Sequence, residues 1–238
     1  MSAICHECPG LAWNAAVNLV RQREIMKRIV RTSALLKSSL MTSSFVTWAW
    51  LALAASIVPA FAGDHAVVRN CTWCHGTSAQ GYTLAPRLAG QRPLYLETQI
   101  RSFREHTRDT PLSKQYMWSA VAALDPGTVR GLAAYFATIP PKAANDGDRA
   151  LAATGRAIYM EGIPDANVAA CYACHGPNAE GIRDIPRLGG LSRFYLKARL
   201  QQWGQGYHSV AGSPMPIVAR SLAPDEIEAL TSYLSFIR

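Results

Sequence analysis

The 238-residue sequence is poor in several features that mark common protein classes. It has only six cysteines and six methionines. No segment shows the strict alternation of apolar and polar residues that is typical of strands, which disfavours a sheet-based fold. The first 62 residues hold 6 of the 24 basic and 2 of the 16 acidic residues, so the net charge falls from +8 for the whole chain to +4 for the rest. This small surplus does not support nucleic-acid binding.

A long apolar run lies near the N-terminus. A basic segment that begins at Met26 precedes the apolar-rich residues 45–62, which end in "AFA". This order is typical of a secretory signal peptide that is cleaved after Ala62. We therefore expect residues 1–62 to be a leader, made of an upstream extension and a signal peptide, and the rest to be exported to the periplasm. Because residues 45–62 approach the roughly 20 residues that span a bilayer, an uncleaved leader would tether the protein to the membrane.

The cysteines after the leader lie in two clusters, "CTWCHG" at residues 71–76 and "CYACHG" at residues 171–176. A zinc ribbon needs two cysteine pairs about 15 to 20 residues apart, whereas 96 residues separate these two pairs. A thioredoxin-like dithiol expects a βαβ setting, which the sequence does not offer. The remaining pair, in "CHEC" at residues 5–8, has no histidine after it, and we assign it no function.

The pattern C-x-x-C-H is typical of covalent haem attachment, in which two thiols form thioethers with the porphyrin and the adjacent histidine ligates the iron. Free thiols of an exported protein would otherwise pair as disulfides. Two copies of the pattern therefore predict two haem c groups. The predicted attachment residues are Cys71, Cys74, Cys171 and Cys174, and the predicted iron ligands on one side are His75 and His175.

The two clusters belong to a longer internal repeat. "APRLAGQ" at residues 85–91 matches "IPRLGGL" at 185–191, one hundred positions later. Further along the chain, matched residues are 98 positions apart. The segment between the repeats is rich in Pro, Gly and Asp, as is typical of a linker. We predict two homologous domains at residues 63–140 and 148–238, joined by a linker at 141–147.

Each predicted domain is made of helices. Asp125 can cap a helix that begins at Pro126, and a matching helix begins at Pro224. Residues 94–106 and 193–203 also show helical spacing. The fold class is therefore all-α, and a core of about 80 to 90 residues is marginal alone. A large apolar cofactor would complete each core.

The second axial ligand of each iron is predicted from the methionines. Met117 and Met215 occupy matched positions of the repeat, while Met160 has no counterpart and is expected to pack. A thioether ligand gives a higher potential than a second histidine. Two alternatives remain: the methionines fill apolar gaps, or His106 or His208 ligates iron, although neither aligns with a histidine in the other half.

Groups beyond the iron ligands also recur. Pro86 and Pro186 each follow the predicted ligand histidine by 11 residues. A ligand histidine donates its remaining N–H to an acceptor, and the proline carbonyl is the expected one. Arg87 and Arg187 come next in the sequence, where they face either haem propionates or solvent.

Together these residues resemble the class I cytochromes c, and specifically the dihaem cytochrome c4 family. The resemblance rests on the two C-x-x-C-H clusters, the "PRL" segments, the "LYLETQI" and "FYLKARL" segments, and the matched methionines. It covers nearly all of residues 63–238 and implies two tandem class I cytochrome c domains, each wrapped around a haem. It also implies the axial pairs His75/Met117 and His175/Met215, and a periplasmic carrier that passes electrons toward a terminal oxidase.

We expect an electron carrier, not an enzyme, because two six-coordinate irons leave no position for a substrate. The expected partners are redox proteins: a cytochrome oxidase, a quinol–cytochrome c reductase or a dehydrogenase. An alternative is the electron-accepting subunit of a periplasmic dehydrogenase, such as a flavocytochrome-type sulfide dehydrogenase. A dihaem peroxidase is less favoured, since it needs a displaceable iron ligand. Residues 63–145 have 9 basic and 5 acidic side chains, against 9 of each afterwards, so the first domain is expected to dock acidic partners.

Two departures from the family pattern lead to expectations of their own. Only eight residues separate Ala62 from Cys71, so the first helix must be short or must continue into the leader. The surroundings of the two methionines also differ, "QYMWS" against "SPMPI", which predicts two unequal potentials.

Overall fold

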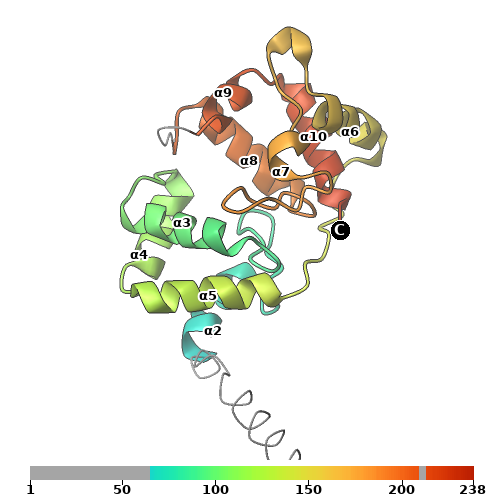
Figure 1. The fold of residues 1–238 in the computed structure, drawn as a ribbon. Helices are drawn as coiled ribbons and strands as arrows, with labels where there is room; N and C mark the ends of the chain where they lie inside the picture. The colour runs from blue at the N-terminus through green and yellow to red at the C-terminus, as the bar shows by residue number, and fades with distance from the viewer. Residues whose placement is uncertain (1–64, 209–212) are drawn as a thin grey trace, which may run out of the picture. The chain divides into compact units, whose positions relative to one another are not determined.

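The structure is a computed structural model that describes residues 65–208 and 213–238 (Figure 1). The predicted leader and its cleavage site lie outside the described residues. The helices of the first half are α2 (His65–His75), α3 (Pro93–Arg104), the π-helix η2 (Ser113–Met117), α4 (Trp118–Val121) and α5 (Pro126–Thr138). Those of the second half are η3 (Arg149–Leu151), α6 (Ala152–Glu161), η4 (Pro164–Ala166), α7 (Tyr172–His175), α8 (Arg193–Gly204), α9 (Met215–Arg220) and α10 (Pro224–Phe236).

The described residues contain no strand, only two isolated bridges between Ile163 and Val168 and between Ile182 and Ile185. The all-α prediction is therefore confirmed. In the same part of the chain, no helix combines the length and the apolar character needed to cross a membrane.

The predicted helix starts are confirmed. Asp125 caps α5 by accepting hydrogen bonds from the backbone N–H groups of Gly127 (2.8 Å) and Thr128 (3.0 Å). α10 begins at Pro224, as predicted. The end predicted for the earlier helix was wrong by two residues, because α3 stops at Arg104. The reason is local: His106 has a φ of 60°, a left-handed conformation that ends a helix.

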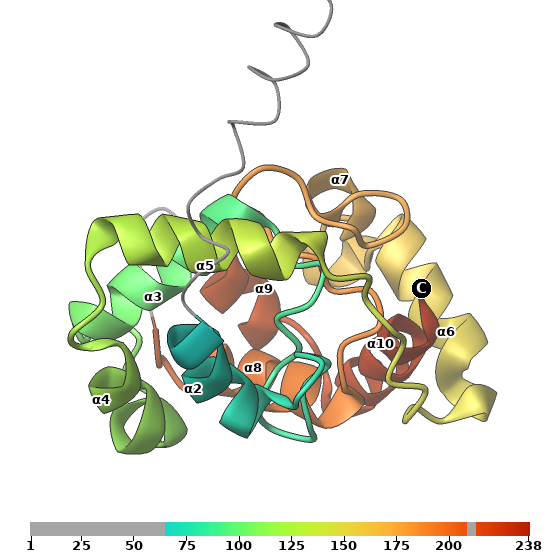
Figure 2. The same cartoon turned by 90° about the horizontal axis from the view of Figure 1, so that it is seen from below.

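The core of the second half forms where α6 packs against α10, a contact visible in both views (Figures 1 and 2). A glycine makes the approach possible, since a Cβ atom on Gly155 would lie 2.0 Å from the carbonyl oxygen of Ala229. One turn later on α6, the fully buried Tyr159 donates its hydroxyl hydrogen to the carbonyl of Gly176 at 2.5 Å. The helix crossing thus positions the turn that follows the second C-x-x-C-H motif.

In the first half, α3 packs against α5, and the C-x-x-C-H motif lies in a different structural setting from that of the second half. Leu132 and Phe136 of α5 are buried at its core. The first motif lies at the end of one continuous helix, α2, whereas the second motif lies in the short α7, separated from α6 by a loop. The described part of α2 has 11 residues, so the first lead-in helix differs from its counterpart.

The segment between Thr138 and Arg149 contains no helix and is held by hydrogen bonds at both ends. Gln80 donates to the carbonyl of Pro140 at 3.0 Å and accepts from the N–H of Lys142 at 2.9 Å. Asn145 donates its N–H to the carbonyl of Ser235 at 3.1 Å. A helix-free segment here agrees with the predicted linker at residues 141–147. The limits of the two domains remain a prediction.

Candidate functional site at the two C-x-x-C-H motifs

The four cysteines of the motifs are free thiols with the same exposure pattern in each half. Cys71 and Cys171 are half-buried, whereas Cys74 and Cys174 are exposed. Burial raises the pKa of the Cys171 thiol to about 11 and shifts the pKa of Cys71 in the same direction. Each motif therefore offers one thiol at the edge of the core and one at the surface.

The histidine that follows each thiol pair is buried and oriented by a single hydrogen bond. Nδ1 of His75 lies 2.7 Å from the carbonyl oxygen of Pro86, and Nδ1 of His175 lies 3.0 Å from that of Pro186. Because a carbonyl can only accept, Nδ1 carries the hydrogen and Nε2 keeps its lone pair for a metal. Burial also lowers the pKa of both imidazoles, which favours the neutral, ligating form.

Two glycines of the repeat let the chain fold back so that the proline carbonyl reaches the histidine. Gly81 has a φ of 78°, and a Cβ atom there would lie 2.5 Å from the backbone nitrogen of Arg87. Gly181 has a φ of 73° and the same 2.5 Å approach to Arg187. Both conformations favour glycine because it has no Cβ. The local sequence therefore builds the same loop around each histidine.

The two matched methionines lie at helix ends of different type. Met117 is half-buried and is the last residue of the π-helix η2, a conformation often found at functional sites. Met215 is the first residue of α9 and packs against the core of the second half, as do Cys171 and Met160. The structure therefore places Met215 and a motif cysteine at one core, while ligation by either methionine remains a prediction.

The two alternative histidines make other contacts. The ring of His106 stacks on Trp118 with centroids 3.8 Å apart. His208 is buried, and its Nδ1 lies 3.0 Å from Nη2 of Arg199, which donates to it. Both rings thus have a neighbour that accounts for their positions.

The sequence left open whether Arg87 faces haem propionates or solvent, and the prediction that it faces solvent was wrong. Its side chain is buried, and its Nη atoms donate to the carbonyls of Gly189 (2.6 Å), Gly190 (2.8 Å) and Lys142 (2.6 Å). These contacts join the "PRL" segment of the first half to the matching segment of the second half. The identical "PRL" letters in both halves were the only signal in the sequence that could have pointed to this contact.

A second hydrogen-bonded contact joins the same segments. The Gln91 side chain accepts from the N–H of Arg187 at 2.8 Å and donates to its carbonyl at 3.0 Å. The Nη1 atom of Arg187 is buried and has no hydrogen-bond partner among the described residues. Sequence reasoning missed this pairing, because nothing in a glutamine side chain marks it as a partner for a backbone a hundred residues away.

The residues present fit haem c. Covalent attachment needs two thiols within one turn, and axial ligation needs a neutral imidazole with a free nitrogen on the same short segment. Each motif provides both, and the orienting bond from the histidine to a proline carbonyl is present twice.

Comparison with known proteins agrees with this geometry. The cytochrome c family model matches residues 152–236. Cytochrome c4 from Thiocapsa roseopersicina is 32% identical over 180 residues, which cover 73% of this chain and 90% of that protein. The thiosulfate dehydrogenase electron acceptor of Stutzerimonas stutzeri is 32% identical over 179 residues, covering 73% of this chain and 81% of that protein. The solved structure of Acidithiobacillus ferrooxidans cytochrome c4 superimposes with a TM-score of 0.65 at 32% identity, covering 70% of this chain and 98% of that chain.

A duplicated haem-attachment motif, an all-helical fold in the described residues and these relatives together define a dihaem c-type cytochrome, whose task is electron transfer and not catalysis. The two haem c groups are its redox centres. Within that class, the chain belongs to the cytochrome c4 family.

Proposed function

We propose that the protein is a periplasmic carrier that moves single electrons between respiratory partners, with one haem c in each of two domains. Cys71 and Cys74 would attach the first haem, and Cys171 and Cys174 the second. The axial pairs would be His75 with Met117 and His175 with Met215. The observation that carries this proposal is the buried histidine of each motif, whose Nδ1 is bound to a proline carbonyl.

The haem iron, when bound, supplies reversible one-electron chemistry between the ferrous and ferric states. The protein's own residues would hold it in place and set its potential. The buried imidazoles stay neutral and would ligate the iron, and the half-buried thiol at the core edge would be one of the two that attach the porphyrin. Trp73 and Cys74 are exposed beside the first histidine, so an electron could enter or leave through this edge.

The proposed electron acceptor is a terminal oxidase, as the family resemblance implies. A second candidate role is electron acceptor for a periplasmic dehydrogenase, and one observation favours it: the Stutzerimonas stutzeri relative is an acceptor for thiosulfate dehydrogenase. The dehydrogenase of this second role would then oxidise a sulfur compound, and the relative's name favours thiosulfate as the substrate.

Stopped-flow spectroscopy of the purified holoprotein separates the two roles. The oxidised protein is mixed with thiosulfate and a thiosulfate dehydrogenase, and the reduced protein with oxidase-containing membranes and oxygen, with cyanide as control. Cyanide-sensitive oxidation by the membranes supports the oxidase role. Fast reduction with thiosulfate, and no oxidation by membranes, would instead support the dehydrogenase role. Failure of both reactions would refute the proposed carrier function.

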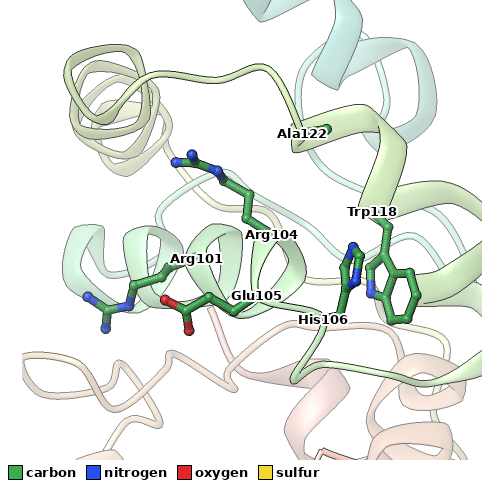
Figure 3. Close-up of a pocket in the computed structure, with 6 residues that line it drawn as sticks. All are labelled: Arg101, Arg104, Glu105, His106, Trp118 and Ala122. Atoms are coloured by element: carbon green, nitrogen blue, oxygen red, sulfur yellow. The ribbon is translucent and has the colours of Figure 1, made fainter.

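A basic surface pocket of the first half is the proposed docking site for an acidic partner. Its lining residues are Arg101, Arg104, Glu105, His106, Trp118 and Ala122 (Figure 3). The exposed Lys114 lies with its Nζ 5.7 Å from the Trp118 ring. The equivalent positions of Arg101 and Arg104 in the second half are Gln201 and Gly204, which carry no charge. Basic side chains that the second half lacks thus lie at a pocket that is also lined by Trp118, the residue after the predicted ligand Met117.

The docking proposal predicts a rate that depends on salt. The double variant R101Q/R104Q should lower the bimolecular electron-transfer rate several-fold at low ionic strength and flatten its salt dependence. The matched control R156Q removes an exposed charge on α6 of the second half and should leave both unchanged. Equal effects of the two variants would refute a docking site in this pocket.

A further inference from the structure

The predicted ligand Met117 lies in a segment that is built differently from the segment around Met215. Met117 is the last residue of the π-helix η2, whose wide turn is closed by a hydrogen bond from the backbone N–H of Trp118 to the carbonyl of Ser113. Ser113 is buried, and its hydroxyl lies 2.7 Å from the hydroxyl of Thr110, which is also buried. One end of η2 is therefore fixed in the core, and the other end depends on how Trp118 is held.

The side chain of Trp118 has contacts on several sides. Its indole N–H donates to the carbonyl of Arg108 at 3.0 Å. The ring of His106 stacks on the indole, with centroids 3.8 Å apart and an angle of 16° between the two planes. Nζ of Lys114 lies 5.7 Å from the centre of the indole ring, within the range of a cation–π contact. Figure 3 shows His106 and Trp118 side by side at one end of the surface pocket.

His106 reaches the indole from the turn that ends α3. Its φ of 60° is left-handed, and its backbone N–H donates to the carbonyl of Phe103 at 3.2 Å. The next residue, Thr107, donates its hydroxyl hydrogen to the carbonyl of Ser102 at 3.2 Å. The imidazole is thus carried by a hydrogen-bonded turn, and a stacked aromatic pair of this kind stabilises the arrangement beyond the area that it buries.

Both rings of the stack are missing from the matching positions of the repeat. Their counterparts are Gly206 and Pro216, which follow 100 and 98 positions later. Gly206 ends α8 as His106 ends α3, with a φ of 92°, so the turn is kept and only the ring is absent. Met215 instead lies between two prolines, whose rings fix the backbone φ on both sides of it. The two halves therefore restrain the backbone beside their methionines by different means.

We propose that Trp118, held by its stack with His106, is a positioning residue that keeps Met117 on the iron of the first haem. This inference rests on the proposed function, because it takes Met117 as an axial ligand. Met117 and Trp118 share a peptide bond, so a movement that takes the methionine off the iron also pulls the indole away from His106. The stack therefore stabilises the ligated conformation of the first half.

The proposal predicts how readily an added ligand displaces Met117. Imidazole can bind the ferric iron only in the fraction of molecules in which the methionine has left it, so the apparent imidazole affinity is proportional to that fraction. Loss of a stacked aromatic pair should enlarge the fraction about two- to tenfold and raise the affinity by the same factor. The second haem, whose predicted ligand Met215 lies between prolines, should keep its affinity.

The test is titration of the oxidised two-haem protein with imidazole, followed by haem absorption. M117A and M215A each open one haem, so they show which titration step belongs to which haem. H106A and W118A should each raise the imidazole affinity of the first haem about two- to tenfold. His106 is exposed, so H106A leaves the core intact. W118F keeps a ring for the stack and should lie closer to the wild type than W118A.

A matched control removes an aromatic contact elsewhere in the first half. Tyr135 of α5 is exposed and lies edge-on to Phe136, with ring centroids 5.3 Å apart. Y135A should therefore leave the imidazole affinities of both haems at their wild-type values, because this pair does not adjoin Met117 in the sequence.

The double variant tests whether the two rings act as one unit. H106A/W118A should raise the affinity no more than W118A alone, because either substitution abolishes the stack. Wild-type affinity in H106A and W118A, or effects that multiply in the double variant, would overturn the positioning role. Equal effects at both haems would also overturn it, since they would reflect a general loosening of the fold. Wild-type affinity in M117A would instead refute ligation by Met117, which belongs to the proposed function.

Discussion

The close crossing of α6 and α10 makes Gly155 the residue whose replacement should damage the fold most for the smallest chemical change. A Cβ atom there would lie 2.0 Å from the carbonyl oxygen of Ala229 and 2.8 Å from Cβ of Tyr233, both well inside van der Waals contact. To make room for this Cβ atom, α6 and α10 must separate by roughly 1 Å or more, since nonbonded carbon atoms pack about 3.5 to 4 Å apart. Overpacking of this kind costs about 1 to 3 kcal/mol, and the loss of helix contacts here favours the upper end.

The substitution G155A should therefore lower the free energy of unfolding by about 3 kcal/mol, although alanine is the better helix former by nearly 1 kcal/mol. G204A is the matched control, because its Cβ would meet only the carbonyl of Ala219, at 3.9 Å at the end of α8. It should leave the stability unchanged or raise it by up to about 1 kcal/mol. The assay is urea unfolding of the holoprotein, followed by far-ultraviolet circular dichroism and by haem absorption. Equal stability of G155A and the wild type would refute the argument from close helix approach.

Two further predictions concern side chains near the sites. Y159F removes the 2.5 Å hydrogen bond to the Gly176 carbonyl and leaves that carbonyl without its donor. The free energy of unfolding, measured with urea, should therefore fall by about 1 to 3 kcal/mol. A decrease below about 0.3 kcal/mol would contradict this expectation. Burial and the neighbouring Arg108 and Arg199 lower the pKa of His208 from about 6.5 to about 3 in the folded protein. The unfolded chain therefore binds more protons between these two pH values, and stability should fall as the pH drops through this window. H208Q should remove this part of the pH dependence, and unfolding curves at a series of pH values would show no difference from the wild type if the reasoning is wrong.

Local signals in the sequence predicted the helices and the haem motifs well. Asp125 before Pro126 is a capping pattern that acts within one turn, and the structure has both the cap and the helix. The repeated "PRL" segments likewise predicted an acceptor carbonyl for each histidine, because the spacing of 11 residues is preserved in both halves. These features depend on contacts that are short in sequence, so the sequence shows them directly.

The contacts between the halves could not be predicted in the same way. Arg87 donates to carbonyls of Gly189 and Gly190, and backbone carbonyls carry no mark in a sequence. The contact between Arg199 and His208 escaped notice because neither residue matches its counterpart in the first half. Only the structure shows that Arg199 donates a hydrogen bond to the imidazole of His208.

The central claim is that the chain holds two haem c groups at its two C-x-x-C-H motifs. Mass spectrometry of the exported protein, denatured in acid and digested, tests this most directly. The account predicts one covalently bound haem on the peptide with Cys71 and Cys74 and another on the peptide with Cys171 and Cys174. Peptides with free thiols, or a haem on one of the two peptides alone, would contradict it.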